Sequence, residues 1–196
     1  MDAVRAMPRE AIRAEQPKLD NKSTVDDAIY AIFSSCIKHW KGNESPVARG
    51  RSAEAIHQMR VALRRMGTAL ADCKDIIPNA QYGWMKRETA WLVTSLGPAR
   101  DWDVFIVELL APVAAALGGD ASFTVAKRAA EAKRKHGYAR AQSTIRSRRY
   151  SNFAGRIGSW LSTKSWHEAD ENKEKVLGES ARKFSGAYFP NVTSKW

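Results

Sequence analysis

The sequence lacks the features of several common classes of protein. No apolar run approaches the roughly 20 residues that a helix needs to span a bilayer, and the N-terminal residues lack the apolar centre of a signal peptide. The P-loop pattern and the glycine-rich dinucleotide turn are both missing. The cysteines, Cys36 and Cys73, are not in metal-ligand spacing, and each lies among apolar residues, which predicts buried thiols. We therefore expect a cytoplasmic protein with no cofactor and no bound metal.

Acidic residues are scarce relative to basic ones. The 196 residues include 32 Lys and Arg against 21 Asp and Glu, which gives a formal net charge of +11 at pH 7. Such an excess favours polyanionic partners: nucleic acid, polyphosphate or an anionic membrane surface. An enzyme acting on phosphate would need acids that hold Mg²⁺, or a positioned base and nucleophile, and neither pattern is present. The sequence therefore predicts a binding protein and no enzymatic reaction.

No segment shows the alternating pattern of a β-strand. Apolar residues instead recur at helical spacing, which predicts an all-α, antiparallel helical bundle with short connections. The expected helices span about 24–40, 52–77, 81–96, 100–119, 123–148 and 153–161. Gly97-Pro98 is expected to end the third helix, and Pro112 to bend the fourth. We assign 1–23 to a linker or flexible tail, 24–162 to the helical domain, and 163–196 to a truncated or divergent C-terminal segment.

The second expected helix carries a row of basic side chains with no acid to balance it. On a helical wheel, apolar residues fill one broad side, and His57, Arg60 and Arg64 lie together on the opposite side, bordered by Arg65. No acidic residue occurs from Ala55 to Ala71, so the like charges repel one another without a counter-ion. Guanidinium groups suit paired contacts with phosphate oxygens, and a protonated imidazole adds a donor. The row predicts an anion-binding face; a merely solvated face is the alternative.

A second concentration of basic residues lies between Lys127 and Arg149, where Glu131 is the only acid. On a wheel these charges spread around most of the helix circumference, so they define no narrow face. Arg148 and Arg149 stand just before the next helix and could turn toward the first basic row. We expect the cations at 133–135 to be ordinary surface residues.

Three segments, "AEAIHQMRVALRRMGTALADCKDIIP", "WLVTSLGPARDWDVFIVELLAP" and "SRRYSNFAGRIGSWL", resemble the CHAD domain, the conserved-histidine α-helical domain. The combination of His-x-x-Arg-x-x-x-Arg-Arg with Leu-Gly-x-x-Arg-Asp-x-Asp-Val is specific. The resemblance covers roughly Val25 to Leu161. The preceding residues resemble the linker that follows a CYTH (triphosphate tunnel) domain.

The resemblance implies a strongly basic helical module that binds inorganic polyphosphate without catalysis, in the cytoplasm or at polyphosphate granules. We expect no membrane partner and only weak binding of nucleic acid. Asp101 and Asp103 match the same motif and are expected to begin a helix and orient Arg100. The polyphosphate-binding residues that the resemblance implies are His57, Arg60, Arg64, Arg65 and Arg100, with Arg148 and Arg149 added.

Members of the family resemble one another in having two related helical halves, and this chain resembles the first half only. A homodimer could supply the missing wall of a polyanion groove, because unpaired helices would leave apolar surface exposed. Two other functions stay open. One is nonspecific nucleic-acid binding, although the basic row lacks the exposed aromatics that stack bases. The other is a phosphohistidine or metal-dependent role centred on His57.

Overall fold

The computed structural model describes residues 11–50, 52–117, 121–167 and 171–182. Within these ranges every regular element is a helix, and one isolated bridge joins Thr24 and Ser180, so the prediction of an all-α fold is confirmed. The described ranges contain no helix long and apolar enough to cross a membrane. The elements in order are α1 (Val25–Gly42), α2 (Glu44–Ala48), α3 (Ala53–Asp72), α4 (Asn79–Val104), the π-helix η1 (Phe105–Leu110), α5 (Ala111–Ala116), α6 (Ala121–Ile145), α7 (Arg148–Ser162), the 3₁₀-helix η2 (Ser165–His167) and α8 (Glu171–Leu177).

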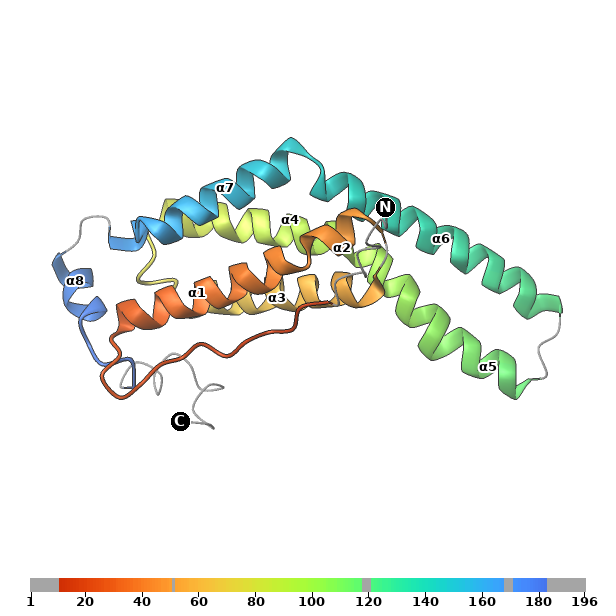
Figure 1. The fold of residues 1–196 in the computed structure, drawn as a ribbon, viewed down its shortest axis with the longest axis horizontal. Helices are drawn as coiled ribbons and strands as arrows, with labels where there is room; N and C mark the ends of the chain where they lie inside the picture. The colour runs from red at the N-terminus through yellow and green to blue at the C-terminus, as the bar shows by residue number, and fades with distance from the viewer. Residues whose placement is uncertain (1–10, 51, 118–120, 168–170, 183–196) are drawn as a thin grey trace, which may run out of the picture.

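Helices α1, α3, α4 and α7 form a bundle around one apolar core (Figure 1). The apolar stripes predicted for α1 and α3 face this core, where Phe33, Met59 and Leu63 are fully buried. Aromatic rings join α7 to α1: Trp40 stacks on Phe153 with ring centroids 5.0 Å apart. Burial of large rings and aliphatic side chains is the main favourable term in such a fold, so this core fixes how α3 and α4 lie.

The helices begin where polar side chains can satisfy the first backbone donors. Thr24 forms a capping box at α1: its hydroxyl accepts from the Asp27 N–H, and the Asp27 carboxylate accepts from the Thr24 N–H. The hydroxyls of Ser52 and Ser147 cap α3 and α7 by accepting from the Ala55 and Tyr150 N–H groups, without the reciprocal bond. The expected starts near Thr24 and Ser52 are therefore confirmed.

The prediction that Gly97-Pro98 ends a helix is wrong. Helix α4 continues through both residues to Val104, and η1 and α5 prolong it, so two expected helices form one helical run. A proline inside a helix removes one backbone donor and crowds the preceding turn. Here α6 packs closely against that turn, because a Cβ on Gly137 would lie only 2.9 Å from the carbonyl carbon of Pro98. Pro112 lies in the first turn of α5, directly after the π-helix, where a proline is tolerated.

The distal hairpin, residues 105–117 and 121–133, extends beyond the bundle (Figure 1). Its outgoing arm is η1 and α5, and its returning arm is the first half of α6. Between the hairpin and α7, α6 packs against α4. The chain thus forms a bundle at one end and a two-helix projection at the other.

Two segments outside the main helices pack on α1. Residues 11–23, within the stretch expected to be a linker, lie along it: the Asn43 side chain pairs with both backbone groups of Ile12, at 3.0 and 2.8 Å. Beyond Ser162, η2 and α8 close the other end, where the Asp26 carboxylate accepts from Trp166 Nε1 at 2.7 Å. Trp166 is fully buried, so this part of the expected C-terminal segment contributes to the core. Residues 1–10 and 183–196 lie outside the described ranges.

Candidate polyanion-binding surface

Helix α3 lies between α1 and α4 and turns its basic row away from the core. The side chains of Met59, Leu63 and Met66 are fully buried, and the row of His57 and Arg64 lies on the opposite side of the helix. His57 is half-buried and Arg64 is exposed. The direction of the row is therefore set by the apolar stripe, because a helix that buries one side presents the other to solvent.

Arg60 is held at the contact between α3 and α4. Its Nη1 donates to the backbone carbonyl oxygen of Val93 at 2.8 Å. Gly97 provides the space for this contact, because a Cβ at that position would lie 3.2 Å from Nη1. A guanidinium group has five N–H donors, and the bond to Val93 uses one of them. Arg60 therefore has a fixed orientation and retains donors for an anion.

His57 and Arg64 are the members of the row whose side chains are not engaged. Within the described part of the chain, neither side chain makes a hydrogen bond or an ion pair. The carbonyl of Arg64 accepts from the Thr68 hydroxyl at 3.3 Å, a backbone contact that leaves the guanidinium free. A cation without a partner attracts a mobile anion more readily than one that is already paired.

Arg65 points to the other side of α3, toward α1. Its Nη2 lies 3.4 Å from the hydroxyl of Ser35, and that hydroxyl donates to the backbone oxygen of Glu15 at 2.7 Å. Its Nη1 is buried and has no hydrogen-bond partner among the described residues. Burial raises the pKa of the neighbouring Cys36 thiol to about 11, although the Arg65 charge opposes this shift. Arg65 is thus placed between α1 and the N-terminal segment, apart from Arg64.

Arg100 lies on the same side of α4 as Val93 and Gly97, because positions seven and three residues apart share a helix face. Its guanidinium pairs with Glu108 at 3.6 Å, and its side chain is 28% exposed. The structure therefore brings Arg100 to the face that Arg60 touches. We call His57, Arg60, Arg64 and Arg100 the α3–α4 basic face.

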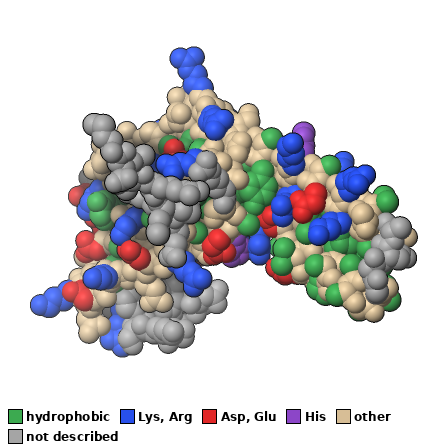
Figure 2. Space-filling model, turned by 45° about the vertical axis from the view of Figure 1, so that its right-hand side comes forward, with side chains coloured by type: hydrophobic (Ala, Val, Ile, Leu, Met, Phe, Trp, Pro, Cys, Tyr) green, Lys and Arg blue, Asp and Glu red, His purple; other side chains and the backbone are tan. Residues whose placement is uncertain are grey.

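Arg148 and Arg149 are not brought to this face. The Nε and Nη2 atoms of Arg149 donate to the Glu88 carboxylate at 2.8 and 3.2 Å, and its guanidinium lies 4.1 Å from the ring centre of Trp91. Glu88 and Trp91 are on the side of α4 opposite Val93 and Gly97, so Arg149 joins α7 to the far side of α4. Arg148 is exposed and has no side-chain partner among the described residues. Lys and Arg side chains are likewise spread widely over the face in Figure 2.

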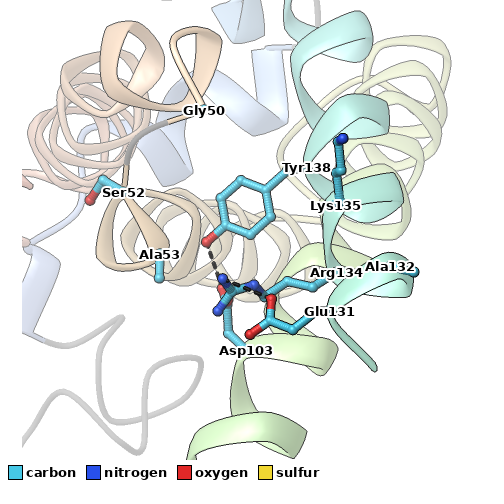
Figure 3. Close-up of a pocket in the computed structure, with 9 residues that line it drawn as sticks. All are labelled: Gly50, Ser52, Ala53, Asp103, Glu131, Ala132, Arg134, Lys135 and Tyr138. Carbon is cyan, nitrogen blue, oxygen red and sulfur yellow. Dashed lines mark hydrogen bonds and ion pairs between the residues drawn. The ribbon is translucent and has the colours of Figure 1, made fainter. Parts of the chain in front are cut away.

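The motif Leu-Gly-x-x-Arg-Asp-x-Asp-Val contributes to the contact between α4 and α6, a role that its spacing suggested only in part. Asp103 is buried, and its Oδ2 accepts from the Tyr138 hydroxyl at 2.8 Å (Figure 3). Arg134 lies 4.0 Å from the other carboxylate oxygen. Burial raises the pKa of Asp103, and the Tyr138 hydrogen bond and the Arg134 charge oppose that shift. Asp103 therefore fastens α6 to α4, whereas Asp101 is exposed within α4 and does not begin a helix.

A pocket lies beside Asp103, and two of the residues expected to be ordinary surface, Arg134 and Lys135, line it. For Arg134 that expectation is wrong, because its guanidinium pairs with Asp103 and Glu131. Ser52 and Ala53 at the start of α3 form one wall, and Arg134, Lys135 and other residues of α6 form another (Figure 3). Their side-chain charges are mixed, since Glu131 pairs with Arg134 at 3.0 Å. The four-residue spacing of Arg134 and Tyr138 on one helix face was the available signal. Within the described ranges, no group of three His, Cys, Asp or Glu side chains could hold a metal ion.

Comparisons with known proteins agree on one family. A family model described as the CHAD domain matches residues 31–188, beyond Leu161, where the sequence resemblance was expected to end. The structure is similar to a crystal structure of the CHAD domain from the plant Ricinus communis, with a TM-score of 0.69 and 31% identity. The aligned region covers 91% of this chain and 56% of that one, so this chain spans little more than half of the solved structure. A search of curated proteins found no significant match.

Proposed function

This chain belongs to the CHAD domain family, and from that premise we propose that it binds inorganic polyphosphate without catalysing a reaction. The binding site we propose is the α3–α4 basic face. The observation that carries the proposal is the row on α3: it has no acid from Ala55 to Ala71, and the side chains of His57 and Arg64 have no partner in the described part of the chain.

The geometry supports a division of labour within this face. Arg60, held by the Val93 carbonyl, presents its remaining donors in a fixed direction. Arg64 is exposed and can adapt its fork to successive phosphates along a flexible chain. Binding of a polyanion releases condensed counter-ions, so the affinity should fall steeply as salt is added. We place the site in the cytoplasm, with polyphosphate granules as the expected location.

The experiment compares long-chain polyphosphate with duplex DNA of equal total charge, each titrated at two salt concentrations. We expect tighter binding of polyphosphate, and we expect Arg64→Ala to weaken it by about tenfold, since a charge-assisted contact contributes about 1–3 kcal/mol. The matched control is Arg140→Ala, which removes an exposed cation from α6 that has no partner among the described residues. Arg64→Lys should restore only part of the affinity, because lysine lacks the planar fork.

Two outcomes would contradict the proposal. Equal binding of DNA and polyphosphate would mean that the net charge of +11 acts only as a nonspecific attractor. Equal losses in Arg64→Ala and Arg140→Ala would place no special site on α3. A separate Arg148→Ala variant tests whether the start of α7 contributes, as the family resemblance implied.

A further inference from the structure

The distal hairpin exposes large apolar side chains. Within the described part of the chain, six of the eight exposed large hydrophobic residues lie on it. Val107 is 63% exposed, Leu117 is 67% exposed and Val125 is 70% exposed. The other three are Phe105, Leu109 and Val113. Single exposed apolar residues are ordinary, but a group of this size on one projection indicates an interaction surface.

Four of these side chains form a continuous stripe. Phe105, Leu109, Val113 and Leu117 are spaced four residues apart along η1, α5 and the residue that caps α5, so they follow one another along one side of the outgoing arm. The π-helix η1 begins this stripe, and such turns occur often at functional positions. In Figure 2 apolar side chains gather over the projecting part of the molecule, on the right.

The hairpin has almost no core of its own. Among its described residues, only Ile106 and Ala130 are buried. Two antiparallel helices form a single layer, and one layer can shield only the side chains between the helices. Phe105 contacts the Trp102 ring, with ring centroids 5.3 Å apart. Leu109, Val113 and Leu117 remain 56%, 48% and 67% exposed, so a second layer is needed to cover them.

The stripe does not suit a polar or anionic partner. Residues 105–117 contain no Lys or Arg, and their only acid, Glu108, already pairs with Arg100. A helix that lies in a membrane surface combines its apolar side with basic residues on its polar side. The outgoing arm lacks those basic residues, and the cations of the hairpin, Lys127, Arg128 and Lys133, all lie on the returning arm. The composition of the stripe itself therefore favours an apolar protein surface over an anionic lipid surface.

We propose that the occupant is a second copy of this chain, whose distal hairpin packs on the first about a two-fold axis. Two helical hairpins that cover each other's apolar sides form a four-helix bundle, a stable way for helices to pack. The contact is isologous, since the same stripe serves on both copies and needs no complementary charge. This inference does not rest on polyphosphate binding.

The test is sedimentation velocity of the full chain over a range of concentrations, with two single variants on the stripe. We expect a dimer, and we expect Leu109→Glu and Val113→Glu each to raise its dissociation constant by about tenfold or more. Leu109 and Val113 are 56% and 48% exposed, so neither change should alter helical content or thermal unfolding of the monomer. The control is Tyr30→Glu, which places the same charge at an apolar side chain of α1 that is 44% exposed.

Any of the following results would overturn the inference. The wild-type chain could remain a monomer at high concentration, or dimers could persist undiminished in both stripe variants. Equal weakening by Tyr30→Glu would place the interface elsewhere. A monomeric wild type that binds vesicles of anionic phospholipid, and loses this binding in Leu109→Glu, would assign the stripe to a membrane surface instead.

Discussion

Gly137 sets the distance between α6 and α4. A Cβ at this position would lie 2.7 Å from the Ala99 nitrogen, 2.9 Å from the Ala99 Cα and 2.9 Å from the Pro98 carbonyl carbon. All three are backbone atoms of α4, so no side chain can rotate away to make room. The two helices cross here as closely as their backbones allow, and the absence of a side chain makes the crossing possible.

We predict that Gly137→Ala destabilises the protein even though alanine favours helix. Overpacking at a tight contact costs about 1–3 kcal/mol, which should exceed the gain of about 0.5–1 kcal/mol in helix propensity. Gly155→Ala in α7 is the matched control, because no atom lies within 4 Å of its added Cβ. Urea unfolding should show lower stability for the first variant and higher stability for the second. Equal stabilisation of both would show that the α4–α6 contact is looser than the structure indicates.

The four basic residues of the motif His-x-x-Arg-x-x-x-Arg-Arg show what a sequence can and cannot predict at the scale of single residues. A helical wheel correctly placed His57 and Arg64 away from the core, because the apolar stripe alone decides that direction. It could not show that Arg60 bonds to the Val93 carbonyl or that Arg65 reaches Ser35. These outcomes depend on which helices flank α3, and periodicity carries no such information.

At the scale of elements, a buried histidine joins α1 to α3. The Gln58 amide nitrogen donates to Glu54 at 2.7 Å, which directs its oxygen toward His39 Nε2 at 2.9 Å. Since an amide oxygen can only accept, Nε2 carries the proton in the neutral ring. Burial lowers the pKa of His39; the Arg65 charge acts in the same direction, and the Gln58 hydrogen bond and the Ile12 backbone oppose the shift.

We predict that this histidine makes the bundle sensitive to mild acid. A folded-state pKa below the usual value of about 6.5 means that the neutral form is favoured in the fold. The stabilisation is present above pH 6.5 and is lost as the pH falls through the lowered folded-state pKa. For His39→Gln we therefore expect the free energy of unfolding to change less between pH 7.5 and 5.5 than it does in the wild type. This range is centred on the usual histidine pKa of about 6.5.

The matched control for this pH series is His136→Gln, because His136 is exposed on α6 and has no partner among the described residues. Urea unfolding at each pH measures the free energy of unfolding of the three proteins. If His39→Gln retained the full acid sensitivity of the wild type, another titrating group would be responsible.

The elements also show where local sequence signals fail. Caps, apolar stripes and connections predicted most helices, since these signals act within a few residues. Gly97-Pro98 was interpreted as a stop, yet the helix continues because α3 and α6 support it from both sides: Arg60 bonds to Val93, and Gly137 packs on Pro98. Tertiary packing therefore outweighed a strong local breaker. The start of α7 at Arg148 was also missed, because the Ser147 cap interrupts a continuous basic stretch.

At the scale of the whole molecule, the charge of +11 makes stability depend on the anions in solution. A ligand that binds only the folded state raises the free energy of unfolding by about 2.7 kcal/mol at one hundred times its dissociation constant. If polyphosphate binds as proposed, we predict that long-chain polyphosphate raises Tm and that added salt suppresses this shift. Differential scanning fluorimetry at low and high salt measures both effects.

Orthophosphate at the same total phosphate concentration is the control for this measurement. It carries charge without a chain that can contact several arginines at once, so we expect a much smaller shift. An equal shift with both would mean that ionic conditions alone stabilise the fold. A shift that survived high salt would point to contacts other than charge.

The contacts between residues 164–181 and the start of α1 have a consequence for synthesis on the ribosome. The Asp26 carboxylate, in the first turn of the first helix, accepts from Lys164, Trp166 and His167, and the Ala181 N–H donates to the Ser23 carbonyl at 2.9 Å. These partners are among the last described residues to be made. A nascent chain can form α3 and α4 early, but the start of α1 stays uncovered until η2 has left the exit tunnel. Completion of the bundle is therefore a late event that brings distant parts of the chain together, and such contacts form slowly.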